Sequence, residues 1–436
     1  MRLRPWWWQY GLWLLLGVGL RVLVMPTAAY GDLHAIAYAL HLLPYNGVWD
    51  VYAALHNLPE AENPVAWMGT DFFPYPPLTY YLLGGAMLLL RPLYGDAFSA
   101  AVSSPFPQFV AQPGIFLWLT LYKLPFLVAD LAMAFLLTAC FSAPAQKRLA
   151  FRLWMLNPVP IIAAYLFGQF DLLPAVLVLA AYLAVLRGWP VAGAVALGLG
   201  AGFKSYPLLL LPLYALVVGR SWQQRGGYGL AGLAAFALTL LPVLGSPVAL
   251  KVIFGSDPSR RVLQAGIPLG ENLGNVGTAY LVLLFLTVLA LHAWRTALGR
   301  PELVGRYFLA VLLLTYGFAF SHLQWFTWSV PFLVLDWVRQ PANRPAHAVL
   351  YLAALLVGLS WQVGPFLEFF LPVSPDLARA LPSLSELVEP IMPIGDAANI
   401  WRSAFAGAAL YWTYTNVLQE PQEKPDTLWG GQPDPK

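Results

Sequence analysis

Long runs of apolar residues, separated by short turns, dominate this chain of 436 residues. The runs are nearly continuous, which is typical of helices with apolar surroundings on several sides rather than of half-buried strands. A helix needs roughly 20 apolar residues to cross a bilayer upright, so the shorter runs are expected to tilt or to join across a kink. The runs occupy residues 6–25, 75–91, 115–141, 153–167, 172–187, 190–203, 207–219, 227–245, 277–294, 307–321, 325–338, 348–364 and 391–416.

These runs predict an all-α, polytopic integral membrane protein. Within lipid, every backbone N–H and C=O group must be paired inside the chain, which leaves helices or closed barrels. Barrel strands alternate apolar and polar positions, and these runs do not. We expect one membrane domain over residues 1–416 with about 12–14 transmembrane helices. Residues 417–436 are polar and rich in proline, and should form a disordered cytoplasmic tail.

Composition strengthens this prediction. Hydrophobic residues make up 59% of the chain and charged residues only 10%, whereas a soluble domain carries roughly 25% charged residues. The net charge of +3 is too small to indicate nucleic-acid binding. The 18 tryptophans and 21 tyrosines suit rings anchored at two membrane interfaces. A single cysteine, Cys140, excludes an intramolecular disulfide.

The basic residues predict the orientation of the helices, because cytoplasmic loops carry an excess of lysine and arginine. Arg2 and Arg4 place the N-terminus inside, and Arg21 interrupts the apolar core that a cleavable signal peptide would need, so residues 6–25 are expected to be a retained helix. Residues 26–74 contain five acidic residues and no lysine or arginine, as an exported loop would. The basic connections expected inside are residues 147–152, 187, 220–225, 295–306 and 339–344.

This orientation leaves one crossing unexplained. An odd number of helices must join the outer residue Asp32 to the inner residue Lys147, yet only two runs lie between them. Either the run 115–141 breaks near Lys123-Leu-Pro125 into two passes, or the run 75–91 does not fully cross.

Polar side chains gather on the outer side of the predicted helices. An ionisable residue within a membrane segment costs at least ~2.5–3.5 kcal/mol, so each one calls for a reason. Carboxylates among several cations suit a reaction in which a base removes a proton while cations hold a phosphate. The set comprises Asp32, Asp71, Gln169, Asp171, Lys204, Lys251, Arg260, Arg261, His322 and Gln324.

Ordinary structural roles are open for several of these residues. Asp171 could be a helix N-cap, and Asn157 before Pro158 is expected to be one. Lys204 could snorkel to the interface. Asp130 follows Lys123 by seven residues on the same helical face, so these two could form a buried structural pair.

Further roles remain open at the outer loops. Arg260 and Arg261 could bind lipid headgroups without specificity. His322 could be a hydrogen-bonded interface histidine, and Asp32 a solvated loop acid. Asp32-x-His34 is a weak signal for a metal site, so we expect no cofactor and leave a divalent metal open.

Several short motifs follow one another in a characteristic order. They are Tyr30-Gly-Asp32-Leu-His34, Phe73-Pro-Tyr75-Pro-Pro77, Lys123-Leu-Pro-Phe-Leu-Val-Ala-Asp130, Leu156-Asn157-Pro158 with Gly168-Gln-Phe-Asp171, Gly202-Phe-Lys204-Ser-Tyr206-Pro207, and Ser321-His322-Leu-Gln324-Trp325. In this order the chain resembles the GT-C superfamily of polytopic glycosyltransferases, which take sugars from polyprenyl-phosphate carriers. Over about residues 30–335 it is similar to the mannosyltransferase that adds the first mannose to GPI-anchor precursors and to its prokaryotic relatives.

The resemblance implies a site and a reaction. An acidic residue in the first outer loop of that family is the catalytic base, and Asp32 occupies its place. The family's frequent Asp-x-Asp reads Asp32-Leu-His34 here, which departs from the pattern at a position associated with metal binding. Lys204, Arg260, Arg261 and His322 would hold the donor phosphate. The residues expected to orient the sugar or the base are Tyr75, Gln169, Asp171 and Gln324.

The expected function is therefore inverting transfer of a hexose, mannose being the first choice, from a polyprenyl-phosphate donor to a lipid, glycan or protein hydroxyl. The reaction would occur at the extracytoplasmic face of a bacterial inner membrane. The main alternative is a flippase for lipid-linked sugars or another transporter, since intramembrane charges and short proline-flanked helices also occur there. A third alternative is a non-catalytic binding subunit with the same fold.

Overall fold

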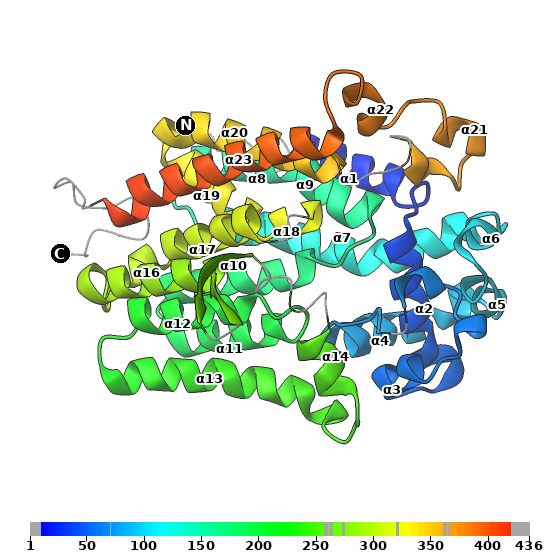
Figure 1. The fold of residues 1–436 in the computed structure, drawn as a ribbon, viewed down its shortest axis with the longest axis horizontal. Helices are drawn as coiled ribbons and strands as arrows, with labels where there is room; N and C mark the ends of the chain where they lie inside the picture. The colour runs from blue at the N-terminus through cyan, green and yellow to red at the C-terminus, as the bar shows by residue number, and fades with distance from the viewer. Residues whose placement is uncertain are drawn as a thin grey trace.

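The structure is a computed structural model, and it describes residues 10–69, 71–256, 260, 265–272, 275–319, 322–360, 364 and 367–419. Over these residues the chain is almost entirely helical, and the long helices run side by side along the longest axis of the molecule (Figure 1). The helices of the bundle are α1 Leu12–Val24, α4 Pro77–Tyr94, α7 Ile115–Ala139, α8 Pro144–Met155, α10 Leu172–Leu186, α11 Pro190–Ala201, α12 Pro207–Val218, α13 Trp222–Leu240, α16 Leu281–Thr296, α17 Val304–Phe318, α19 Val330–Arg339, α20 Arg344–Ser360 and α23 Ile394–Thr413.

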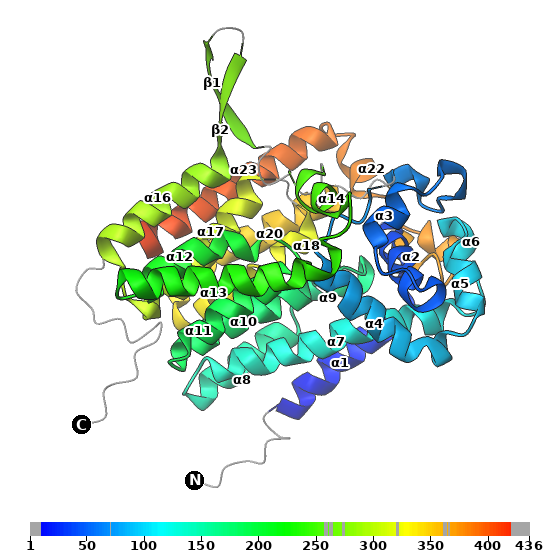
Figure 2. The same ribbon diagram turned by 90° about the horizontal axis from the view of Figure 1, so that it is seen from below.

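Shorter helices connect these long ones. Two follow α8 directly, α9 Pro158–Ile161 and the π-helical turn η4 Ile162–Leu166. One end of the bundle, which we call the loop end, carries α2 Gly31–Asn46, α3 Val51–His56, α5 Ala97–Val102, α6 Phe106–Val110, α21 Pro375–Ala378 and α22 Leu384–Val388 (Figures 1 and 2). The other short helical elements are η2 Glu60–Glu62, η3 Ala66–Met68, η5 Leu241–Val243, α14 Ala249–Gly255, η7 Pro301–Leu303, α18 Leu323–Phe326, η8 Pro341–Asn343, η9 Glu368–Phe370 and η10 Tyr414–Leu418.

Each predicted apolar run overlaps one or more helices, and the described residues are almost all helical, so the all-α fold class is confirmed for them. Among these residues, four helical segments are long and apolar enough to cross a membrane. They are Ile115–Ala139, Pro144–Leu166, Trp222–Val243 and Pro341–Ser360. Predictions for residues 1–9, including Arg2 and Arg4, and for the tail beyond residue 419 lie outside the described residues.

One of the two explanations offered for the missing crossing is excluded. The run 115–141 does not break near Pro125, because α7 continues through this proline as one helix of 25 residues. Strands β1 Gly266–Asn272 and β2 Asn275–Tyr280 form an antiparallel hairpin that projects from the bundle (Figure 2). The pattern of apolar runs does not predict this hairpin.

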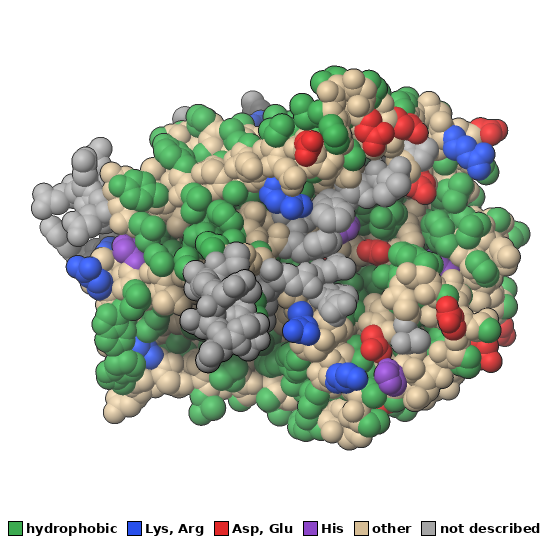
Figure 3. All heavy atoms as spheres, in the orientation of Figure 1, with side chains coloured by type: hydrophobic (Ala, Val, Ile, Leu, Met, Phe, Trp, Pro, Cys, Tyr) green, Lys and Arg blue, Asp and Glu red, His purple; other side chains and the backbone are tan. Residues whose placement is uncertain are grey.

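Basic side chains gather at the opposite end of the bundle, which we call the basic end. The guanidinium of Arg225 lies over the rings of Trp222 and Trp294, at 5.1 and 5.7 Å from their centroids. Arg339 donates to the carbonyl of Cys140 at 2.8 Å. The Arg225 contacts join the start of α13 to the end of α16, and the Arg339 bond joins the end of α19 to the end of α7. By contrast, the acidic side chains visible in Figure 3 lie toward the loop end.

Lys123 and Asp130 of α7 are buried, but they do not form the predicted pair with each other. The Lys123 ammonium donates instead to the carbonyls of Met25 and Ala28, at 2.9 and 2.6 Å. Asp130 is bonded to Arg21 of α1, whose Nε lies 2.5 Å from its carboxylate. All three charged side chains are fully buried, so they fasten the chain around α1 to α7 and have structural roles.

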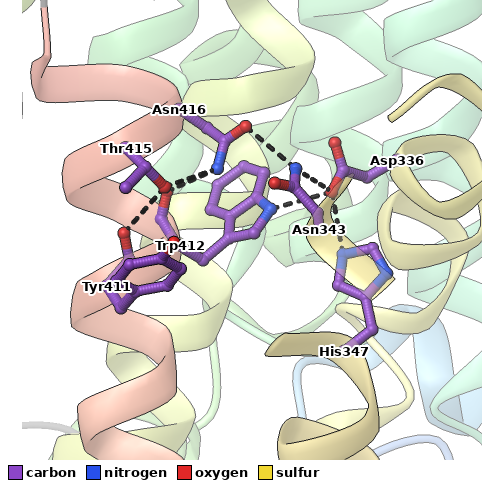
Figure 4. A network of polar contacts seen from close by, with 7 residues as sticks. All are labelled: Asp336, Asn343, His347, Tyr411, Trp412, Thr415 and Asn416. Atoms are coloured by element: carbon purple, nitrogen blue, oxygen red, sulfur yellow. Dashed lines mark hydrogen bonds and ion pairs between the residues drawn. The ribbon is translucent and has the colours of Figure 1, made fainter. Parts of the chain in front are cut away.

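A second buried carboxylate fastens three helices near the basic end (Figure 4). Asp336 of α19 accepts, on one oxygen, bonds from Asn343, His347 and Trp412, each at 2.8 Å. His347 lies on α20 and Trp412 on α23, and both are fully buried. One side chain of α19 thereby fixes the positions of α20 and α23.

Replacing Asp336 by alanine is expected to destabilise the protein by about 3–5 kcal/mol, because three buried donors lose their acceptor. The control is Asp96→Ala, since the Asp96 side chain is 98% exposed. Thermal unfolding of the purified variants in detergent measures the difference. Equal unfolding temperatures for the two variants would contradict the structural role of Asp336.

Candidate functional site

The candidate site lies where four connections meet beside the loop end. Asp32 is in the first turn of α2, and Tyr75 precedes α4. Gln169 and Asp171 lie between η4 and α10, and Lys204 lies between α11 and α12. Pro77 and Pro207 stand at the first positions of α4 and α12, where a proline without an N–H is tolerated.

Asp32 is held by an amide from a distant part of the sequence. The Gln169 side-chain N–H donates to one Asp32 oxygen at 3.1 Å. Asp32 is partly exposed, whereas Gln169 is fully buried. A buried amide that bonds one carboxylate oxygen fixes the direction of that carboxylate.

Gly168 allows the turn that carries Gln169 to pack closely against α2, which carries Asp32. Its φ of +70° belongs to the left-handed region, and a Cβ here would overlap the side chain of Leu33, next to Asp32. The Gly168 carbonyl also accepts from the Tyr122 hydroxyl at 3.2 Å. Glycine is therefore required both by the backbone turn and by the close contact between this turn and α2.

Gly168→Ala is expected to destabilise the protein by about 2–4 kcal/mol, the sum of left-handed backbone strain and overpacking against Leu33. Gly188→Ala is the matched control, because Gly188 has a φ of +76° with no atom within 4 Å of an added Cβ. Unfolding temperatures of both variants measure the difference. If the two variants unfold at the same temperature, the close contact with Leu33 has no energetic role.

Asp171 and Lys204 form a buried ion pair. The Lys204 ammonium lies 2.9 and 2.8 Å from the two Asp171 oxygens, and Lys204 is 8% exposed. Its charge also faces the rings of Tyr75 and Phe170, at 5.3 and 4.8 Å from their centroids. The snorkelling alternative for Lys204 is therefore wrong.

Asp171 also accepts from the indole N–H of Trp328 at 2.6 Å. Although it stands at the N-cap position of α10, its side chain makes no capping bond, so the N-cap interpretation is wrong. Asn157, in contrast, accepts from the backbone N–H of Val159 at 3.0 Å, which confirms its predicted role.

Trp328 and Tyr206 are site residues that the sequence analysis missed. Their rings stack at a centroid separation of 3.9 Å, and the ring of Trp325 stacks on Trp328 at a centroid separation of 5.0 Å. The spacing of Trp325 and Trp328 by three residues, directly after the quoted His322-Leu-Gln324 motif, was the available signal. Together these rings form an aromatic wall beside Asp171.

His322 and Gln324 approach the site from α18. His322 lies 6.1 Å from the ring of Phe167, which in turn contacts Tyr30 at 5.3 Å. Gln324 is buried, and no described atom bonds its side-chain oxygen. These contacts place His322 on the same side of the bundle as Asp32.

A second carboxylate, Glu368, belongs to the same region and was missed. The backbone N–H of Ala29 donates to the carbonyl of Phe369 at 2.8 Å, which ties η9 to the start of α2. Burial, followed by the nearby carboxylates of Asp32 and Glu368, raises the pKa of Tyr30 to about 12. Glu368 lies between two apolar runs, in a stretch where no periodic pattern distinguishes one acid from another.

The described contacts do not bring Asp71, Lys251 or Arg260 to this site. Arg260 is exposed, and among the described contacts none joins it to Asp32 or Lys204. Arg261 lies outside the described residues. Asp71, with 40% of its side chain exposed, pairs with His56 at 3.1 Å. The exposed Lys251 belongs to α14, which contacts α3.

The Asp32-x-His34 signal does not form a metal site. His34 is buried, is bonded at Nε2 to the carbonyl of Val102 at 2.9 Å, and stacks on Phe109. Burial lowers the pKa of His34 to about 4. Within the described part of the chain, no three His, Cys, Asp or Glu side chains are grouped as metal ligands.

No protein-family model, curated protein or solved structure matches this chain. The function proposed below therefore depends on the chain's own residues and their geometry.

Proposed function

We propose that this protein is a multi-pass membrane glycosyltransferase that takes a hexose, mannose being the first choice, from a polyprenyl-phosphate donor. The observation that carries this proposal is the position of Asp32. It is a partly exposed carboxylate at the loop end, fixed by the buried amide of Gln169 beside the Asp171–Lys204 pair. A fixed carboxylate next to buried polar groups is suited to general-base chemistry.

The membrane setting is supported by the surface of the bundle. Leu15 and Leu89 are 72% and 83% exposed, although Arg21, Lys123 and Asp130 are fully buried. Apolar side chains outside and charged groups inside suit lipid as the solvent. With the basic end in the cytoplasm, about 12–14 helices cross a bacterial inner membrane and the site lies on the extracytoplasmic side.

The proposed reaction is a single displacement at the anomeric carbon. Asp32 accepts the proton of an acceptor hydroxyl as the oxygen forms its bond to that carbon. The bond from the anomeric carbon to the phosphate oxygen breaks, and its electron pair leaves with the polyprenyl phosphate. No nucleotide is consumed, since the donor's phosphodiester supplies the energy.

The cations would stabilise the departing phosphate. Lys204 uses two of its three N–H bonds on Asp171, which leaves one for a phosphate oxygen. His322, Arg260 and Arg261 would supply further donors when donor substrate is bound. Trp325 and Tyr75, which are partly exposed, would offer apolar ring faces to the sugar, and the buried stack of Tyr206 and Trp328 supports Trp325.

Purified protein in proteoliposomes with radiolabelled polyprenyl-phosphate mannose and a lipid-bound acceptor tests this proposal. We expect label to appear in a new glycoside in proportion to the amount of protein. Label that crosses the bilayer without a new glycosidic bond would favour the transporter alternative and contradict the enzyme proposal.

A further inference from the structure

A groove on the outside of the bundle lies away from the candidate site. It has a volume of about 320 Å³ and lies between α8, α19 and α20. Its apolar lining includes Leu153, Leu156, Leu333, Val334, Trp337 and Tyr351. Leu156 and Ala348, which also lines it, are exposed, so the groove opens on the surface that would face lipid.

Polar groups accompany the apolar lining of this groove. Arg152 of α8 lines the groove, and Arg344, which is not a lining residue, has its guanidinium 5.5 Å from the ring centroid of the lining residue Trp337. At the far end, Asn157 donates to the Tyr351 hydroxyl at 2.9 Å. The direction of the groove is therefore fixed, with two cations near the basic end and a neutral hydrogen bond deeper in the bundle.

The two cations are not neutralised by the protein. Arg152 and Arg344 are exposed, and within the described ranges neither forms an ion pair with a carboxylate. Arg152 instead faces the ring of Trp13 at 5.4 Å. A cation held on an aromatic ring at a membrane surface is well placed for a phosphate, because it is oriented and has no competing anion.

A buried contact holds two walls of the groove together. Asp336 of α19 and His347 of α20, which adjoin the lining residues Trp337 and Ala348, lie 2.8 Å apart (Figure 4). A preformed groove binds a flexible chain without first having to open.

We propose that the α8–α20 groove is a binding site for an anionic phospholipid of the leaflet at the basic end. One acyl chain lies along Leu153, Leu156 and Val334, and the headgroup phosphate is bonded by Arg152 and Arg344. Basic pockets between membrane helices on the cytoplasmic side favour such headgroups. The inference depends on the membrane setting proposed above and is independent of the transfer reaction.

Native mass spectrometry of the delipidated, detergent-solubilised protein tests this proposal, with phosphatidylglycerol and phosphatidylcholine as probes. We expect phosphatidylglycerol to be retained in preference to phosphatidylcholine. Retention should fall about tenfold in the double variant Arg152→Gln/Arg344→Gln, because two phosphate donors are lost. Ala348→Trp should also lower retention by filling the groove.

Matched controls distinguish the groove from the general surface. Arg295→Gln removes an exposed charge at the basic end, and Val349→Trp adds an indole to the neighbouring position of α20; neither residue lines the groove. Both should bind phosphatidylglycerol as the wild type does. Equal retention of the two lipids, or unchanged retention in the groove variants with normal unfolding temperatures, would overturn the proposal. Sugar transfer is measured separately, so loss of one property does not imply loss of the other.

Discussion

Asp32→Asn is expected to lower the rate of sugar transfer by about 10²–10⁴-fold, the usual contribution of a general base. Asparagine keeps an oxygen that can accept the Gln169 bond, which is 3.1 Å long in the wild type. Its amide cannot take a proton from the acceptor hydroxyl. The variant should therefore fold and bind donor normally while its turnover is lost.

The assay is the initial rate at saturating donor, measured beside the unfolding temperature. Asp71→Asn is the control, because Asp71 is an outer-loop carboxylate that pairs with His56 and not with the site. It should retain wild-type turnover. Normal turnover by folded Asp32→Asn would remove Asp32 from the mechanism.

Asp171→Ala should have the largest effect on folding among the site residues. It leaves the buried Lys204 ammonium without its carboxylate and the Trp328 indole N–H without its acceptor. Breaking a buried ion pair by removing one partner costs about 3–5 kcal/mol. We expect a large fall in unfolding temperature and in yield.

The double variant Asp171→Leu/Lys204→Met provides the matched comparison. Replacing both partners by apolar groups removes the uncompensated charge, so most of the stability should return. Sugar transfer should remain low, because the N–H bond available to the phosphate is gone. If the double variant is no more stable than Asp171→Ala, the ion pair is not what holds this turn.

The helices could be predicted because long apolar runs limit the backbone to one solution in lipid. The partners of the buried charged residues could not be predicted from the sequence. Asp130 bonds Arg21, which is 109 residues away, rather than Lys123 on its own helix. Spacing along one helix shows only which residues share a face, whereas the partner is decided by which other helix packs there.

The residues of the candidate site could likewise be predicted only in part. Gln169, Asp171 and Lys204 could be identified because polar groups at helix ends in an apolar chain need a reason. Trp328 and Glu368 could not, since a tryptophan in an apolar run and an acid in a loop are both ordinary. Arg260 was placed with the site by its charge, but no described contact brings it there.

The configuration at the anomeric carbon of the product tests the central claim most directly. A single displacement with Asp32 as base forms a new glycosidic bond with the configuration opposite to that of the donor. Nuclear magnetic resonance of the purified product, made from polyprenyl-phosphate mannose of known configuration, measures it. The account predicts inversion; retention of configuration, or no glycoside at all from folded protein, would contradict it.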